Sequence, residues 1–194
     1  MQVDIYDFDK TAVPYDSALK YWNWCLLHRP YLIIIVPFQF VCGLLAFLRI
    51  IPIPVYKRVC FRFVRLLNTK KTVKQFWDKR QKDVYPFFLP ENRNADRKCV
   101  LISASPNFLI EEIAARLKVD YCISSPHDER SGRLLGNVCR RDEKVKRFRE
   151  LLPDAEVCDV YSDSIKHDKY IFSLGKRRFL AKKGTLKEIN CDFN

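Results

Sequence analysis

The sequence predicts an α/β fold, in which a parallel sheet is covered by helices on both faces and an α-helical cap is inserted. Three observations lead to this prediction. After residue 95, short apolar strand candidates alternate with helix candidates; polar clusters follow the strands; and the excess positive charge lies in one block. The 194 residues, 48% of them hydrophobic, suffice for one domain with an insertion.

The net charge of +12 is unevenly distributed along the chain. Residues 13–94 hold 14 basic and 4 acidic side chains, whereas the remainder holds 21 basic and 19 acidic ones. We therefore predict a near-neutral core, residues 1–12 and 95–194, and a basic cap, residues 13–94. Such a surplus indicates an anionic partner, which is nucleic acid, a membrane surface or a phosphorylated substrate.

The first predicted elements are a strand over residues 2–8 and a helix that Asp16 or Ser17 caps and that stops near Pro30. An apolar run over residues 31–48 follows, and it is about as long as a thin bilayer span. This run is either the buried core of a soluble cap or a segment that contacts a membrane.

Two further helices are predicted in the cap. Over residues 56–67, arginines recur at helical spacing with apolar residues one position behind them, which is typical of a basic amphipathic helix. The second helix spans residues 72–84. The candidates for contact with a membrane or a substrate are the arginines of this region, Arg49, Arg58, Arg62 and Arg65.

The chain beyond residue 95 alternates between strands and helices, which favours a parallel sheet. The predicted strands cover residues 99–102, 119–123, 156–161 and 178–181, and the predicted helices cover residues 106–117, 142–152 and 165–173. The polar stretch over residues 124–139 is too long for a simple crossover, and we expect a short hairpin within it.

Polar clusters that follow strands are the first places to look for a site, because ligands of parallel sheets bind where strands end. Asp7 and Asp9 follow the first strand, and one of them can serve as nucleophile and the other as general acid and base. Ser103 and Ala104 follow the second strand. Pro106 fits the first position of the next helix and Ser105 its cap, so Ser103 and nearby amides would face an anion.

Two later residues add to this pattern. Lys144, near the start of a helix, would place a positive charge on the same anion, although Lys146 and Arg147 on that helix are equally good candidates by position. Asp163 follows a further strand and offers the oxygen ligand that Mg²⁺ prefers.

These residues carry a resemblance to a known family. DFDKT at 7–11, LISASP at 101–106, the lysine of GNVCRRDEKV at 136–145 and YSDSIKHD at 161–168 resemble, in this order, the four motifs of the haloacid dehalogenase (HAD) superfamily. Residues 13–94 fall where that superfamily inserts its helical cap. The chain is most similar to the phosphoserine-phosphatase-type branch, which includes the lipid phosphatase phosphatidylglycerophosphatase C. One departure is Lys10, where many relatives have a small residue.

The resemblance implies a Rossmann-like core and a Mg²⁺-dependent phosphomonoester hydrolase. Asp7 would attack phosphorus to form an aspartyl-phosphate, and Asp9 would protonate the leaving oxygen and then activate water. The phosphoryl oxygens would be held by Ser103, Ala104 and Lys144. Mg²⁺ would be bound by four acidic residues, Asp7, Asp9 through its carbonyl, Asp163 and Asp168.

A lipid phosphate such as phosphatidylglycerophosphate is the expected substrate, because the basic cap carries an apolar run. Asp7 and Ser103 must meet in one site, so the run does not cross a membrane once; it is re-entrant or lies in the interface. We expect a cytoplasmic protein at the cytoplasmic face of a membrane, since its N-terminus has no signal-peptide pattern and positive residues flank the apolar run on both sides. The eight cysteines form no C-x-x-C pair, which argues against a zinc site, and we expect them to be reduced.

Two alternatives remain open. A soluble phosphatase for a small metabolite such as phosphoserine would use the apolar run as cap core. A protein of another class, a membrane- or RNA-binding protein with a vestigial site, would keep the acidic residues without catalysis. The sequence has no recognisable nucleic-acid-reading motif, so nucleic acid is the least favoured partner, and no oligomeric state is predicted.

Overall fold

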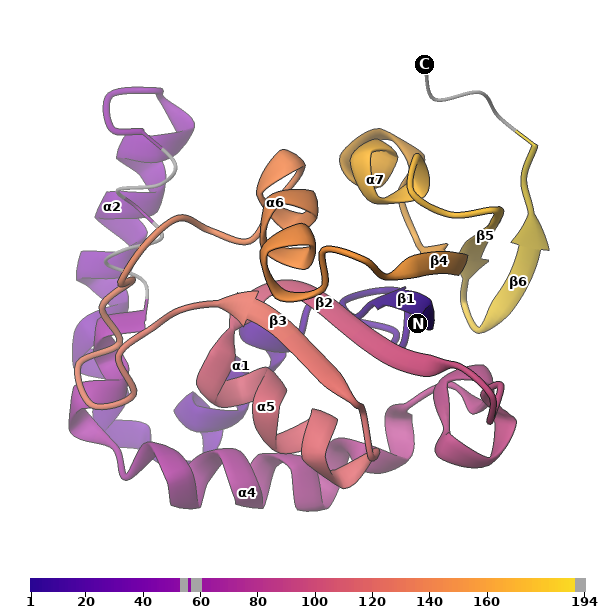
Figure 1. Ribbon diagram of the computed structural model, residues 1–194. Coiled ribbons are helices and arrows are strands. Elements are labelled where there is room, and N and C mark those ends of the chain that lie inside the picture. The colour runs from indigo at the N-terminus through magenta and orange to yellow at the C-terminus, as the bar shows by residue number, and fades with distance from the viewer. Residues whose placement is uncertain (53–55, 57–60, 191–194) are drawn as a thin grey trace.

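A six-stranded sheet lies at the centre of the molecule (Figure 1). The computed structural model describes residues 1–52, 56 and 61–190. The sheet order is β3-β2-β1-β4-β5-β6; the first five strands are parallel and β6 is antiparallel to β5. The strands are β1 (Gln2–Asp7), β2 (Lys98–Pro106), β3 (Tyr121–Ser125), β4 (Glu156–Ser162), β5 (Arg177–Lys182) and β6 (Thr185–Glu188).

Helices cover both faces of this sheet, which confirms the predicted α/β fold (Figure 1). α5 (Asn107–Arg116) lies on one face, and α6 (Asp142–Leu151) and α7 (Ile165–Phe172) lie on the other. Each face has its own buried cluster, because successive strand residues point to opposite sides: Leu101 belongs to the first cluster, and Val100 and Ile102 belong to the second.

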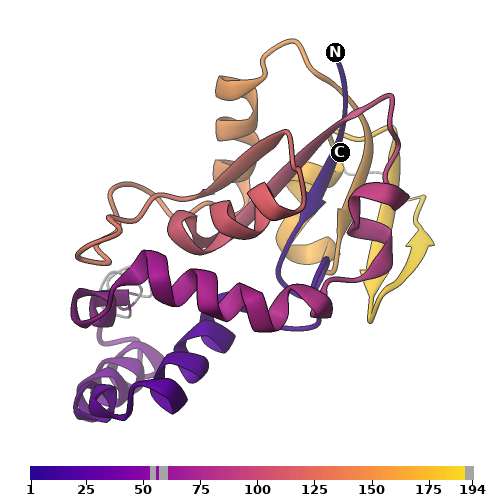
Figure 2. The ribbon, with the colours of Figure 1, turned by 90° about the horizontal axis from the view of Figure 1, so that it is seen from below.

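The predicted cap segment forms a group of short helices beside the face that carries α5 (Figure 2). Asp16 caps α1 by accepting a hydrogen bond from the Leu19 amide, as the sequence predicts, and Asn68 caps α4 in the same way. The helices are α1 (Ser17–His28), η1 (Pro30–Ile35), α2 (Val36–Phe47), η2 (Phe61–Leu66), α4 (Thr69–Arg80), η3 (Gln81–Asp83), η4 (Pro86–Phe88) and η5 (Pro90–Asn92).

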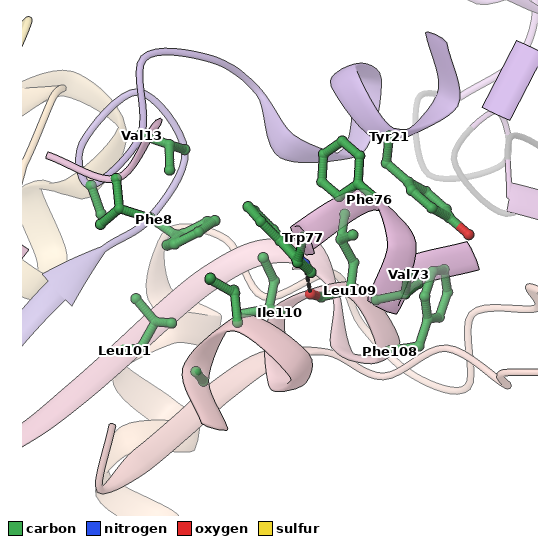
Figure 3. Close-up of a cluster of buried hydrophobic side chains, with 14 of the residues drawn as sticks. Phe8, Val13, Tyr21, Val73, Phe76, Trp77, Leu101, Phe108, Leu109 and Ile110 are labelled. Carbon is green, nitrogen blue, oxygen red and sulfur yellow. Dashed lines mark hydrogen bonds between the residues drawn. The ribbon is translucent and has the colours of Figure 1, made fainter. Parts of the chain in front are cut away.

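One buried cluster joins this segment to the sheet (Figure 3). Trp77 and Phe76 of α4 are fully buried, and the Trp77 ring lies edge-on to Phe8 with ring centroids 5.8 Å apart. The Trp77 Nε1 hydrogen bonds to the Leu109 carbonyl at 2.8 Å, which fastens α4 to α5. The division into core and cap stays a prediction, and its two parts share this hydrophobic cluster.

α2, the longer helix of the apolar run, has no buried residue. Residues Pro30–Phe47 have a mean hydropathy of 2.1 with 6% of them buried, and they form a helix long and apolar enough to cross a membrane. The large exposed side chains of α2 are Phe38, Phe40, Val41, Leu44 and Phe47. Within the described residues the run is therefore mostly exposed, although Leu32 belongs to the buried cluster.

The helix expected over residues 56–67 is α-helical at Tyr56, but Phe61–Leu66 forms a 3-10 helix instead of an α-helix. Phe63 and Val64 are both buried there. Arg58 lies outside the described residues. Arg49, Arg62 and Arg65 are exposed.

The polar stretch after β3 contains the expected hairpin, with a bridge between His127 and Leu134. Its tip reaches the N-terminal end of α4, where the Thr69 hydroxyl donates to the Glu129 carbonyl at 2.9 Å (Figure 2). Gly132 has a φ of +67°, and a Cβ there would lie 1.9 Å from the Phe61 carbonyl oxygen. The hairpin thus packs directly against η2.

Candidate active site

Three strand ends meet at one edge of the sheet. β1 ends at Asp7, β2 at Pro106 and β4 at Ser162, and the three strands are parallel. β1 lies between the other two, where the order of the strands reverses. This is the position at which open parallel sheets bind their ligands.

A buried lysine links two carboxylates at this edge. Lys144, from the first turn of α6, lies 2.7 Å from Asp7 Oδ1 and 2.8 Å from Asp168 Oδ1. All three side chains are less than a tenth exposed. The second oxygen of each carboxylate accepts a hydroxyl hydrogen bond: Thr11 donates to Asp7 at 2.9 Å, and Ser162 donates to Asp168 at 2.6 Å. Both carboxylates are therefore held in fixed orientations.

Asp163 completes an acidic cluster with Asp7 and Asp168. One oxygen from each of the three carboxylates lies within 4.8 Å of the others. The Asp163 amide donates to the Thr11 hydroxyl at 2.8 Å, so Thr11 connects the loop after β4 to the end of β1. Carboxylate oxygens at this spacing fit a small hard cation such as Mg²⁺.

The Asp9 carboxylate faces a separate set of donors. Its Oδ1 accepts from the Ser17 amide at 2.7 Å, and its Oδ2 accepts from the Ser105 hydroxyl at 2.5 Å and from the Ser103 hydroxyl at 3.4 Å. The Ser103 oxygen in turn accepts from the Ser105 amide at 3.0 Å. The Asp9 side chain is thus positioned apart from the three-carboxylate cluster.

Burial raises the pKa of the two acids, whereas ion pairs decide the pKa of Lys144. Burial raises the pKa of Asp7, and the Lys144 ammonium opposes that rise. Burial and the nearby Asp16 charge raise the pKa of Asp9, against the hydrogen bonds from Ser105 and Ser17. Although burial lowers the pKa of Lys144, the carboxylates of Asp7 and Asp168 outweigh this effect and raise it, so Lys144 stays charged.

The structure brings together the predicted residues Asp7, Asp9, Ser103, Lys144, Asp163 and Asp168. Ala104 lies between Ser103 and Ser105, and its carbonyl accepts a hydrogen bond from Ser125. The exposed cap arginines, Arg49, Arg62 and Arg65, are not among the residues that line the cavity next to Asp9.

The expected cap of the helix after β2 is wrong. The strand continues through Pro106, which occupies the N-cap position of α5 without a side-chain hydrogen bond. Ser105 therefore remains in the strand, and its hydroxyl turns to Asp9 instead of capping the helix.

The sequence analysis missed three hydroxyl contacts of the site. Thr11 binds Asp7, Ser105 binds Asp9 and Ser162 binds Asp168. The only available signal is that each stands within or beside one of the quoted motifs. Lys10 is exposed with a φ of +62°, a left-handed conformation that glycine adopts more readily. This conformation turns the chain after Asp9 and explains why a small residue suits the position.

Solved structures with a similar fold come from several bacteria. A protein of unknown function from Bordetella pertussis Tohama I has a TM-score of 0.66 and 14% sequence identity, with 81% of each chain covered. A probable phosphoserine phosphatase from Vibrio cholerae has a TM-score of 0.61 and 15% identity, over 92% of this chain and 55% of that one. A phosphoserine phosphohydrolase-like protein from Francisella tularensis has a TM-score of 0.50 and 16% identity, over 82% of this chain and 77% of that one. At these identities the likenesses establish a common fold.

A search of curated proteins finds no match to the chain. The family model of haloacid dehalogenase-like hydrolases matches residues 5–170, which include the acidic cluster, Lys144 and the Asp9 serine set. The match covers well over half of the sequence, from within β1 into α7. The chain therefore belongs to the haloacid dehalogenase-like hydrolase family.

Proposed function

We propose that this hydrolase is a Mg²⁺-dependent phosphomonoesterase that acts through an aspartyl-phosphate intermediate. The observation that carries the proposal is the convergence of Asp7, Lys144, Asp163 and Asp168 at the end of β1, with Asp9 in a separate hydroxyl-lined position. A nucleophile, a fixed cation, a set of metal ligands and an acid are the groups that phosphoryl transfer requires.

Asp7, Asp163 and Asp168 would hold Mg²⁺. A bound Mg²⁺ would offset the negative charge of the phosphoryl oxygens so that an anionic carboxylate can approach them. Lys144, which lies beside Asp7, would contact the oxygens of the phosphoryl group, and so would Ser103 and Ala104.

The chain's own residues account for both chemical steps. In the first, an oxygen of Asp7 bonds to phosphorus, the bond from phosphorus to the leaving oxygen breaks, and Asp9 gives that oxygen its proton. In the second, Asp9 takes a proton from water, the water oxygen bonds to phosphorus, and the bond to Asp7 breaks. The raised pKa of Asp9 favours the protonated form that the first step needs.

Removal of the metal tests this part of the proposal. We expect EDTA to abolish phosphate release from an aryl phosphate and Mg²⁺ to restore it. Asp163→Asn should raise the Mg²⁺ concentration for half-maximal activity by at least about tenfold, because one anionic ligand is lost. Asp154→Asn, at an exposed position outside the cluster, should leave that concentration unchanged. Full activity in EDTA would contradict the metal assignment.

We also propose that the substrate is a membrane lipid phosphate, such as phosphatidylglycerophosphate, and that the enzyme docks on the cytoplasmic face of a membrane. The exposed apolar side chains of α2 support this proposal, since several large apolar side chains exposed together on one helix normally mark an interaction site. The alternative, a soluble phosphatase for a small metabolite such as phosphoserine, gives these side chains no partner among the described residues.

An orientation in the plane of the interface fits the positive charges best. Arg29 precedes η1 and Arg49 follows α2, so the two cations stand at opposite ends of the helical run. The 12 residues of α2 alone span about 18 Å. A re-entrant orientation would place Arg49 in the hydrocarbon, whereas an interfacial helix keeps both arginines among the headgroups.

Sedimentation with vesicles tests the docking. We expect the protein to sediment with anionic vesicles at low salt and less so at high salt, because each basic residue near the surface contributes about 1 kcal/mol. Phe40→Asp with Phe47→Asp should sharply reduce the bound fraction, since both side chains are exposed on α2. Leu151→Asp, on α6, is the matched exposed apolar control. Equal binding of all three proteins would exclude α2 as the docking surface.

A further inference from the structure

A cavity of about 290 Å³ lies next to Asp9 and Ser105. Its walls are mainly apolar and come from α1, η2 and the loop that follows the hairpin: Ala18, Leu19, Trp22, Phe61, Phe63 and Val138. The His127 ring extends this wall and lies edge-on to Phe61, with ring centroids 5.1 Å apart. Asp9, the proposed general acid, therefore lines a cavity whose walls include several aromatic side chains.

The position of the cavity determines which part of a substrate would enter it. An acid that protonates the leaving oxygen must lie within hydrogen-bond reach of that oxygen. The proposed nucleophile Asp7 and the phosphoryl-binding Lys144 do not line the cavity, whereas Asp9 and Ala104 do. The alcohol that departs with the leaving oxygen would thus extend from Asp9 into this space.

The charges of the cavity discriminate between leaving groups. Its two ionisable acids, Asp9 and Asp16, are close enough for the Asp16 charge to raise the pKa of Asp9. Among the lining residues in the described part of the chain, none is lysine or arginine, although the protein has a net charge of +12. A carboxylate placed here would lose hydration and meet two acids, and His127 is the one basic side chain among the described lining residues.

We propose that this cavity is the leaving-group site and that it accepts an uncharged, apolar alcohol, such as the acylglycerol part of a lipid phosphate. This inference rests on the proposed phosphatase function and narrows its substrate class to lipids whose phosphomonoester is carried directly by the acylglycerol. Phosphatidylglycerophosphate falls outside this class, because its leaving alcohol carries a phosphodiester anion. Gln39 of α2 and Tyr56 also line the cavity, so it adjoins the helix that would lie in the membrane interface. A lipid could therefore pass from the bilayer to Asp9 along apolar walls.

A series of soluble phosphates tests the chemistry of the site without a membrane. With ethyl, butyl and hexyl phosphate, we expect kcat/KM to rise with chain length by up to about fourfold for each buried methylene. Phosphoserine should be a poorer substrate than ethyl phosphate, because its carboxylate would face Asp9 and Asp16. No dependence on chain length, or a preference for phosphoserine, would overturn the inference. If no ester released phosphate, the proposed function itself would fail.

A pair of substitutions on α1 tests whether the dependence of kcat/KM on chain length arises in this cavity. Leu19 lines the cavity, whereas Leu27, on the same helix, does not; they are 59% and 81% exposed, so a lysine at either position can be hydrated. Leu19→Lys should remove most of the chain-length dependence and raise kcat/KM for phosphoserine. Leu27→Lys should retain the wild-type ratios. If the two variants behaved alike, with unchanged circular dichroism, the cavity would not be the leaving-group site.

Discussion

The Asp7→Asn variant is expected to lose phosphate release, with kcat lowered by roughly 10³-fold or more. Asparagine has nearly the same size as aspartate and keeps an acceptor for the Thr11 hydroxyl, but its amide provides no anionic oxygen to attack phosphorus. We would measure Mg²⁺-dependent release from an aryl phosphate. We would also measure phosphate that stays bound to acid-quenched protein, because the aspartyl-phosphate forms on this side chain.

Asp154→Asn is the control for the Asp7 variant. Asp154 is exposed and lies just before β4, whereas the site lies beyond the other end of that strand. The control should keep both turnover and the acid-stable phosphoprotein. Substantial turnover by Asp7→Asn, with normal folding, would show that another group attacks phosphorus.

The central strands of the sheet could be predicted from the sequence, because strands buried on both faces appear as continuous apolar runs. β1, β2 and β4 are covered on both faces, so their apolar runs stand out against the polar loops. β6 was not predicted, since its four residues are mostly exposed and offer no such run. Its one local signal is the turn at Lys183 and Gly184, where both residues have positive φ.

Position in the sequence indicated the acidic residues after the strands and Ser103, but it could not distinguish Lys144 from Lys146 and Arg147. Charged residues that follow buried strands have few roles other than chemistry, which is why Asp7, Asp9 and Asp163 could be proposed from their positions. Hydroxyl residues near strand ends are common, and the path of the backbone decides which of them faces a carboxylate. Ser105 shows this, because the N-cap of α5 lies one residue later than predicted, at Pro106, and Ser105 donates to Asp9 instead of capping the helix.

The Lys144→Met variant is expected to lose about 3–5 kcal/mol of unfolding free energy when measured in EDTA. Lys144 is 3% exposed and is the shared ion-pair partner of Asp7 and Asp168, whereas methionine fills a similar volume without charge. Two buried carboxylates would then face each other without a cation. Adding Asp168→Asn to this variant should recover part of the loss, because one of the two charges disappears.

The loss of unfolding free energy in Lys144→Met should also depend on pH, and it should grow as the pH rises. Burial already raises the pKa of Asp7 against the opposing charge of Lys144, and loss of that charge raises it further. The folded variant then binds protons that the unfolded chain releases, so its stability deficit is largest near about pH 8 and shrinks as the pH falls. Lys146→Met, on the exposed side of the same helix, should change the urea midpoint little at either pH. A deficit of equal size for both lysines would mean that the buried ion pairs do not stabilise the fold.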